Sequence, residues 1–196
     1  MVKELTLPFP NVEFQPLLTE VAALKPDAVF TFFAGGGAVK FVKDYAAAGL
    51  KDTIPLLSSG FLTDGNIEAQ GDAAQGLLTT LHYADGLDTP RDNAFRADYT
   101  KQYPDMAPDV YAVQGYDAAQ LLAVGLAAVK GDASQKTAMR DAMRGATIDS
   151  PRGKFTLSKA GNPIQDIYLR EVSGDQNKSL GVAVKALADP ARGCRL

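Results

Sequence analysis

The chain has 196 residues, of which 46% are hydrophobic, so it is long enough to bury a core in one large or two small domains. Its 20 basic and 23 acidic residues leave a net charge of -3 without a long basic run, which argues against nucleic acid or an anionic membrane surface as a partner. The single cysteine, Cys194, excludes an internal disulfide and a metal cluster built from thiolates.

No targeting or membrane segment is visible in the chain. Its first residues have no basic stretch followed by an apolar run and a small-residue cleavage site, so no signal peptide is visible. The longest apolar stretches, such as 28–34, are far shorter than the roughly 20 residues needed to span a bilayer. We therefore expect a protein without a membrane span.

The first 81 residues alternate between helical and strand patterns. The run 28–33 is β-branched and aromatic without polar alternation, which predicts a central parallel strand covered on both faces. The predicted elements are, in order, a helix over 14–24, a strand over 28–33, a helix from the glycines at 35–37 to Gly49, and strands over 54–57 and 77–83. This order is typical of an α/β protein with a doubly wound parallel sheet, because parallel neighbours need a crossover connection.

A polar, turn-rich stretch over 84–88 marks a domain boundary. Thr89 is then placed to cap a helix with Pro90 at its first position. The remaining predicted elements are a buried helix over 116–129 that is apolar on most sides, a helix over 134–145, and strands over 155–157 and 167–172. Beyond Val172 we expect the order to weaken.

The strongest local signal for a binding site is Phe32-Phe33-Ala34-Gly35-Gly36-Gly37, where a buried strand leads through a flexible glycine loop to a helix N-terminus. Backbone amides there have no partner within the helix and the helix dipole favours a negative group, so a carboxylate or phosphate could be held without a charged side chain. The alternative is a tight strand-to-helix turn that binds nothing. The segment matches neither a P-loop nor a dinucleotide fingerprint.

Ser59, Gly60 and Phe61 repeat this arrangement at the end of the next predicted strand. The whole segment, Leu57-Ser58-Ser59-Gly60-Phe61-Leu62, offers two hydroxyls, a permissive glycine and an aromatic wall. An ordinary loop serine and a core phenylalanine are the alternative interpretation of the same residues. The hypothesis of a site depends on the pairing, because two neighbouring strand ends can share one pocket.

Tyr111 and Tyr116 lie near the start of the predicted buried helix, where a ring with a polar tip could line a wet cavity, although packing tyrosines are commoner. His82 is the only histidine, so the sequence indicates neither a Ser-His-Asp set nor a Cys-His pair. No close pair of carboxylates sits at two strand ends. We therefore predict a binding protein with no catalytic residue, no metal site and no cofactor.

Seven segments form an ordered set that is far more specific than any one motif. They are 25–30, 34–36, 45–51, 54–56, 71–76, 111–118 and 149–155. Together they resemble the later part of type I periplasmic solute-binding proteins of the branched-chain amino acid and aromatic acid type. The similarity extends over about 5–172, which is nearly the whole chain.

The resemblance implies two doubly wound lobes, joined by three crossing segments, that close over a solute without chemistry and present it to an ABC permease in the periplasm. By this analogy residues 1–81 belong to the second lobe, 82–161 to the first, and 162–196 return to the second, with crossovers near Tyr83 and Asn162. Roughly the first half of the family pattern has no counterpart in this chain, so exposed sheet edges could favour self-association.

The resemblance also implies which residues contact the solute. The implied contacts are Ala34, Gly35, Ser59, Gly60, Phe61 and, from the other lobe, Tyr116. In amino-acid binders the position of Ser59 holds an acid that pairs with the ammonium group of the solute. Because Ser59 is uncharged and Phe33, Phe61 and Tyr116 are aromatic, an aromatic or other hydrophobic carboxylate is favoured over a solute with a free amino group.

Three other functions stay open at this point. The chain could be a ligand-sensing regulatory domain of the same fold, in which closure drives a different partner. It could be a hydrolase or transferase that uses Ser59, which would require a general base that the sequence does not show. It could also fold without binding a ligand.

Overall fold

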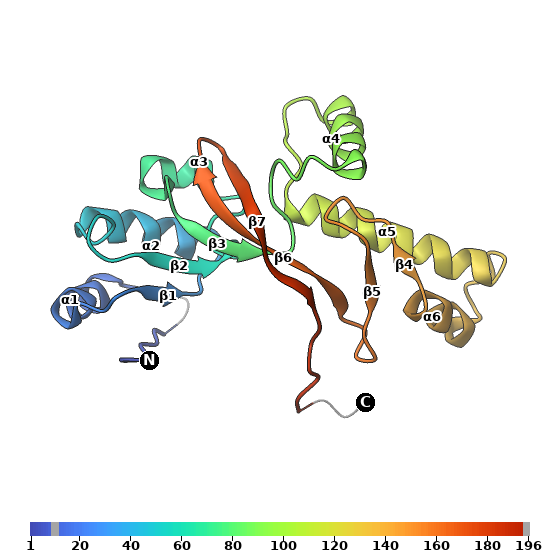
Figure 1. Ribbon diagram of the computed structural model, residues 1–196, viewed down its shortest axis with the longest axis horizontal. Helices are drawn as coiled ribbons and strands as arrows, with labels where there is room; N and C mark the ends of the chain where they lie inside the picture. Colours follow the sequence, from blue (N-terminus) through green and yellow to red (C-terminus); the bar gives the residue numbers. More distant parts are fainter. Residues whose placement is uncertain (9–11, 194–196) are drawn as a thin grey trace. The chain divides into compact units, whose positions relative to one another are not determined.

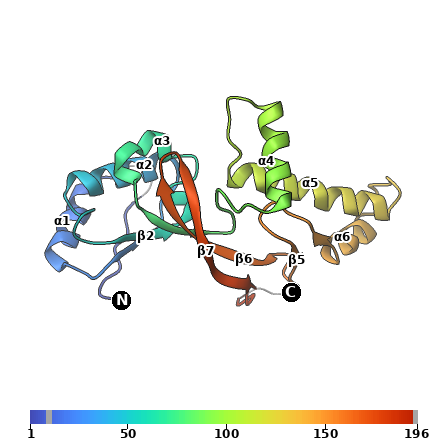
Figure 2. The same cartoon turned by 45° about the horizontal axis from the view of Figure 1, so that its top comes forward.

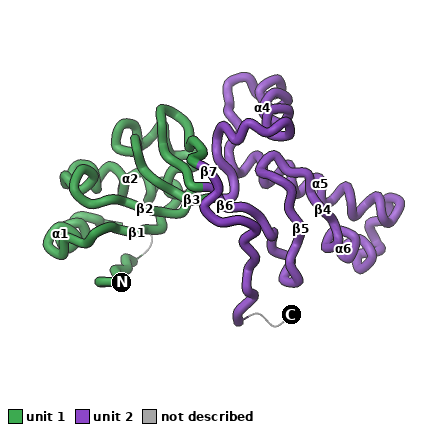
Figure 3. The backbone as a smooth tube through the Cα atoms, in the orientation of Figure 1, with its two compact units in different colours: residues 1–81, 169–180 green, residues 82–168, 181–196 purple. Residues whose placement is uncertain are grey.

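The computed structural model describes residues 1–8 and 12–193, and two views of it are shown in Figure 1 and Figure 2. Cys194 lies outside the described residues. The chain divides into two compact units (Figure 3): unit 1 is Met1–Leu81 with Leu169–Leu180, and unit 2 is His82–Tyr168 with Gly181–Leu196. Within the described ranges, none of the helices has the length and apolar character to cross a bilayer.

Unit 1 is built on parallel strands that alternate with helices (Figure 1). Strand β1 pairs in parallel with β2, which pairs in parallel with β3, and Ser58 lies opposite Thr31 on one side and Thr79 on the other. The elements are α1 (Gln15–Leu24), β1 (Val29–Thr31), α2 (Gly35–Ala47), β2 (Leu56–Ser59), the 3-10 turn η1 (Gly60–Leu62), α3 (Ile67–Gln70), η2 (Gly71–Ala74) and β3 (Leu78–Leu81). This confirms the α/β alternation predicted from the sequence.

The core of unit 1 lies between α1, α2 and the sheet. Phe14 packs edge-on against Phe41 with ring centroids 5.1 Å apart, and Phe41 packs against Tyr45 at 5.8 Å. The Tyr45 hydroxyl donates a hydrogen bond of 2.9 Å to the Ile54 carbonyl, so its polar end is satisfied where it is buried. Each large apolar side chain buried in this way contributes roughly 1.5 to 3 kcal/mol to folding.

Strand β1 was predicted to be central and covered on both faces, and this prediction is wrong for the described residues. β1 is the outermost strand of the sheet order, and the side chains of Phe30 and Phe32 are 73% and 63% exposed. Val29 and Phe33 point to the other face and pack against the core. The apolar run therefore reflects one buried face and one open aromatic face, because successive side chains in a strand alternate.

The chain beyond Val172 is ordered, contrary to the sequence prediction. Strands β6 (Pro163–Ser173) and β7 (Gln176–Leu187) pair with each other across the turn at Gly174 and Asp175, and both strands run through both units. In unit 1, β6 lies beside β3, with the Val172 amide donating 3.0 Å to the Leu77 carbonyl. The pattern was hard to recognise because most side chains of β7 are exposed.

Unit 2 contains three helices and short antiparallel strands. The elements are α4 (Pro90–Gln102), α5 (Val110–Ala128), α6 (Lys136–Arg144), β4 (Thr147–Ile148) and β5 (Phe155–Leu157). β4 pairs with β5 and β5 with β6, both antiparallel, as the short connections between them require. Thr89 Oγ1 accepts 3.1 Å from the Asp92 amide, which confirms the predicted cap of α4.

Helix α5 differs from its prediction in both length and burial. It begins at Val110, because Asp109 caps it by accepting 3.0 Å from the Ala112 amide, so that the helix extends six residues beyond the predicted start at Tyr116. Helix α6 lies along one side of it (Figure 2), and Gly125 allows close approach because an added Cβ would lie 2.7 Å from Met139 Cγ. Other sides are open, and Leu122 is 49% exposed.

Candidate functional site

The segment between β1 and α2 presents backbone amides at an exposed helix N-terminus. Gly35, Gly36 and Gly37 form the first turn of α2 itself, so the predicted flexible loop is instead helical. Ala34 is the extended N-cap residue and its side chain gives no capping hydrogen bond within the described chain. Gly35 has φ +56, a left-handed conformation that favours glycine, and Ala34, Gly35 and Gly36 are all exposed. The first amides of α2 are therefore free to meet an anion.

The aromatic side chain that faces outward at this strand end is Phe32. Phe33, named as a contact from the sequence, packs its ring against Phe14 at 5.0 Å and Phe41 at 4.8 Å and belongs to the core. Phe32 instead meets Phe61 of the next strand end edge-on, with centroids 6.2 Å apart. The structure therefore brings Phe61 together with Phe32, and the alternation of side chains along β1 is the signal that could have shown it.

The two serines at the end of β2 have different roles. Ser58 is buried and its hydroxyl donates 2.8 Å to the Thr31 carbonyl, so it ties β2 to β1. Ser59 Oγ is shielded from solvent and has no hydrogen-bond partner among the described residues. A shielded hydroxyl without a partner loses the free energy of hydration, which a ligand group could restore.

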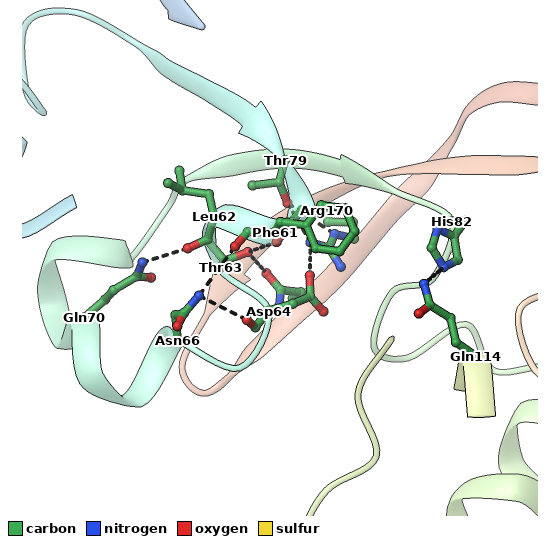
Figure 4. Close-up of polar contacts among 12 residues, drawn as sticks. Phe61, Leu62, Thr63, Asp64, Asn66, Gln70, Thr79, His82, Gln114 and Arg170 are labelled. Carbon is green, nitrogen blue, oxygen red and sulfur yellow. Dashed lines mark hydrogen bonds and ion pairs between the residues drawn. The ribbon is translucent and has the colours of Figure 1, made fainter. Parts of the chain in front are cut away.

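Gly60 lies against a buried arginine that sequence reasoning missed. An added Cβ at Gly60 would lie 2.2 Å from Nη2 of Arg170, so no other residue fits at this position without a shift. Arg170 Nη2 in turn donates 2.6 Å to Asp64 Oδ2 and 3.0 Å to Thr79 Oγ1, as Figure 4 shows. The loop after β2 is therefore supported from β3 and β6.

In unit 2, the ring of Tyr116 lies between a phenylalanine and an arginine. Phe95 packs against it edge-on at 5.1 Å, and Arg91 places its guanidinium carbon 5.3 Å from the ring centroid. Arg91 Nε also donates 3.0 Å to the Asp149 carbonyl. Such a cation over an aromatic ring is favourable, and it fixes one face of Tyr116.

The buried carboxylates of unit 2 serve ion pairs and hydrogen bonds. Asp117 accepts 2.8 Å from Arg152 Nε and 2.9 Å from the Ser150 hydroxyl. Burial raises the pKa of Asp117 above its ordinary value, while Ser150 and Arg152 oppose that shift. Within the described part of the chain no base hydrogen-bonds to Ser59 Oγ, and no group of three His, Cys, Asp or Glu side chains could hold a metal ion. His82 contacts Gln114 at 3.1 Å.

Comparison with known proteins identifies the family of the chain. A family model described as periplasmic binding protein matches residues 1–178. A curated relative from Brucella melitensis, the Leu/Ile/Val-binding protein homolog 6, is 30% identical over 178 residues, which are 88% of this chain and 45% of that protein. The chain thus spans about half the length of the curated relatives it matches.

Solved structures give the same result. An ABC transporter solute-binding protein from R. palustris in complex with benzoate matches with a TM-score of 0.92 and 51% identity, covering 100% of this chain and 53% of that one. Another from Rhodopseudomonas palustris HaA2, in complex with p-hydroxybenzoic acid, has a TM-score of 0.88 and 29% identity, with 98% and 54% covered. Its fold and these matches confirm the resemblance seen in the sequence: the chain belongs to the periplasmic binding protein family.

Proposed function

We propose that the chain is part of the solute-binding component of an ABC importer, and that its solute is a small aromatic carboxylate such as benzoate. The observation that carries this proposal is the 51% identity over the whole chain to a solute-binding protein that was crystallised with benzoate. Independent support comes from the residues at the ends of β1 and β2, which can complement a carboxylate and an aromatic ring.

A benzoate-like solute has two parts that unit 1 can complement. Its carboxylate would meet the first amides of α2 at Gly35 and Gly36, where the partial positive charge of the helix end lies. Its ring would pack against the edge-on pair Phe32 and Phe61. Ser59 would supply the remaining hydrogen bond from its shielded hydroxyl. No acid stands at position 59 to pair with an ammonium group, which disfavours an amino acid.

The remaining assignments follow from membership of the family. Tyr116 of unit 2 is a further aromatic contact by the sequence match, and unit 1 would correspond to the second lobe of the complete receptors. An ABC permease is the protein partner, the compartment is the periplasm, and the solute is released unchanged, so no catalytic step is involved. The open aromatic face of β1, with Phe30 exposed, is the surface through which the chain would self-associate.

The test is a ligand screen by thermal unfolding and titration calorimetry with benzoate, 4-hydroxybenzoate, leucine and benzyl alcohol. A ligand that binds only the folded state raises the free energy of unfolding by about 2.7 kcal/mol at a hundredfold excess over Kd. We expect benzoate and 4-hydroxybenzoate to stabilise the chain, and benzyl alcohol, which lacks the carboxylate, to have no effect. Ser59→Glu and Tyr116→Ala should weaken benzoate binding. Stabilisation by leucine alone would refute the proposal.

A further inference from the structure

A buried polar cluster lies directly beneath the loop that carries Ser59 and Phe61. The Arg170 cluster comprises Asp64, Thr79 and Arg170, which come from the loop after β2, from β3 and from β6 (Figure 4). Arg170 is 1% exposed, and Asp64 and Thr79 are also buried. The guanidinium thus has almost no access to water.

A buried ion pair adds little to the stability of the fold, so we expect this one to fix the position and orientation of the groups around it. Taking both charges of an ion pair out of water costs several kcal/mol per ion, and a well-packed apolar pair of similar volume is often as stable. What an apolar pair lacks is the planar fork of arginine, which fixes direction as well as distance. Two nitrogens of Arg170 donate to the same oxygen: Nε lies 3.2 Å and Nη2 3.0 Å from Thr79 Oγ1. Thr79 in β3 therefore sets the orientation of the guanidinium plane.

The loop backbone rests on this guanidinium at one residue. Gly60 approaches so closely that a Cβ would lie 2.2 Å from Nη2 and 2.8 Å from Cζ of Arg170, and 2.8 Å from Cβ of Leu81. Gly60 stands between Ser59, whose hydroxyl is shielded without a partner, and Phe61, whose ring meets Phe32. A shift of the guanidinium would therefore displace the hydroxyl and the ring together.

The rest of the loop is anchored without Arg170. The Thr63 hydroxyl donates 2.6 Å to Asn177 Oδ1, Asn66 Nδ2 donates 3.1 Å to the Asp64 carbonyl, and Gln70 Nε2 donates 2.8 Å to the Leu62 carbonyl. Asn66 Nδ2 also lies 3.4 Å from the Phe61 carbonyl, so these bonds tie the loop together from residue 61 onward, and Asn177 anchors it to β7. Loss of Arg170 would consequently remove the support behind Gly60 and the partner of the Asp64 carboxylate, while Thr63, Asn66 and Gln70 keep the bonds just described.

We propose that Arg170 is a positioning residue for solute binding: held by Asp64 and Thr79, it sets where the Ser59 hydroxyl and the Phe61 ring lie, and so controls affinity and the choice between aromatic acids. The solute class in this inference rests on the proposed function. The positioning of residues 59–61 by Arg170 does not, because it can be measured in the chain without a ligand.

The first measurement is amide hydrogen exchange of the whole, ligand-free chain. The variants are Arg170→Met, Arg170→Lys, and the double replacement Asp64→Leu with Arg170→Met, which leaves no uncompensated charge if Arg170→Met alone fails to fold. We expect exchange at residues 59–61 to rise about tenfold or more relative to that at α1, with Arg170→Lys recovering only part of the protection. Leu18→Ala, in the core of the same unit, is the matched control and should raise exchange across unit 1 without singling out 59–61.

The second measurement is the dissociation constant for benzoate and for 4-hydroxybenzoate. Arg170→Met and the double replacement should weaken benzoate binding about tenfold and change the ratio of the two constants, whereas Leu18→Ala should leave the ratio unchanged. Gly60→Ala should weaken benzoate binding in the parent chain. The loss of affinity should be smaller in the double replacement, where the guanidinium is gone.

The outcomes separate the two proposals. Protection of 59–61 that is the same in the parent chain and in every Arg170 variant would overturn the inference, whatever the chain binds. Raised exchange with an unchanged ratio of constants would overturn the control of selectivity. A parent chain that binds neither acid would defeat the proposed function, while the exchange data would still decide whether Arg170 positions the loop.

Discussion

Ser58 donates a hydrogen bond of 2.8 Å to the backbone carbonyl of Thr31, whereas the hydroxyl of the adjacent Ser59 has no partner among the described residues. The two side chains point to opposite faces of β2, as neighbours in a strand must. One serine therefore stabilises the sheet, and the other is free to serve a ligand.

Alanine at each serine should separate these two roles. Ser58→Ala should lower the free energy of unfolding by about 1 kcal/mol, because a buried hydrogen bond is lost, and should leave benzoate affinity unchanged. Ser59→Ala should change stability by less than about 0.5 kcal/mol but weaken benzoate binding about fivefold. Urea unfolding and calorimetry measure the two quantities. An equal loss of affinity in both variants would show that the hydroxyl of Ser59 makes no specific contact.

Phe32 and Phe33 form a second matched pair. Phe33→Ala should cost about 3 kcal/mol of stability, because its ring packs on Phe14 and Phe41 in the core. Phe32→Ala should cost about 1 kcal/mol or less, since its ring is mostly exposed and meets Phe61 edge-on. The effect on benzoate affinity should be reversed, with Phe32→Ala the more harmful. A larger loss of affinity in a folded Phe33→Ala chain would restore Phe33 as the wall of the site.

The cap of α5 is a test of local helix chemistry in unit 2. Asp109→Ala removes the oxygen that accepts 3.0 Å from the Ala112 amide, and we expect a loss of about 1 kcal/mol in the free energy of unfolding. The exposed Asp105, which precedes the helix, is the matched control, and Asp105→Ala should stay within about 0.5 kcal/mol of the parent. Equal effects of both substitutions would mean that lost negative charge, and not the cap, is responsible.

The elements that the sequence predicts well are those with local signals. The cap of α4 at Thr89, with Pro90 behind it, is read from neighbouring residues. The apolar stripe alone predicts a start of α5 at Tyr116, whereas the cap at Asp109 begins the helix at Val110. The run 28–33 does not fix which of Phe32 and Phe33 faces outward, because a shift of one residue exchanges the two faces of a strand.

Long-range contacts explain what the sequence could not show. Arg170 is a charged residue within a strand pattern, and its partners Asp64 and Thr79 lie 106 and 91 residues away in the chain. No local pattern links these positions, so neither the buried ion pair nor the need for glycine at position 60 could be inferred. Strand β7 was missed for a related reason: its order comes from pairing with β6 more than from burial of its own side chains.

The fully buried Asp92 predicts that the stability of unit 2 depends on pH. Its Oδ1 accepts 3.0 Å from the Tyr83 hydroxyl, while its Oδ2 has no hydrogen-bond partner among the described residues. Burial raises the pKa of Asp92 above its ordinary value of 3.8, opposed by the Tyr83 hydrogen bond and the charge of Arg96 and reinforced by the charge of Asp85. The folded chain thus binds this proton more tightly than the unfolded chain does.

The sign of the pH dependence follows from that difference. Between pH 3.8 and the raised pKa the folded state carries more protons at Asp92, so this group's contribution to the free energy of unfolding is full below pH 3.8 and falls as pH rises through the window. Asp92→Asn stays neutral, so its stability relative to the parent should improve steadily across the same window and level off above it. Urea unfolding at a series of pH values measures the difference, with Asp98→Asn, at an exposed position of the same helix, as the control. A difference between Asp92→Asn and the parent that does not change with pH would mean that Asp92 has the same proton affinity in the folded and unfolded chain.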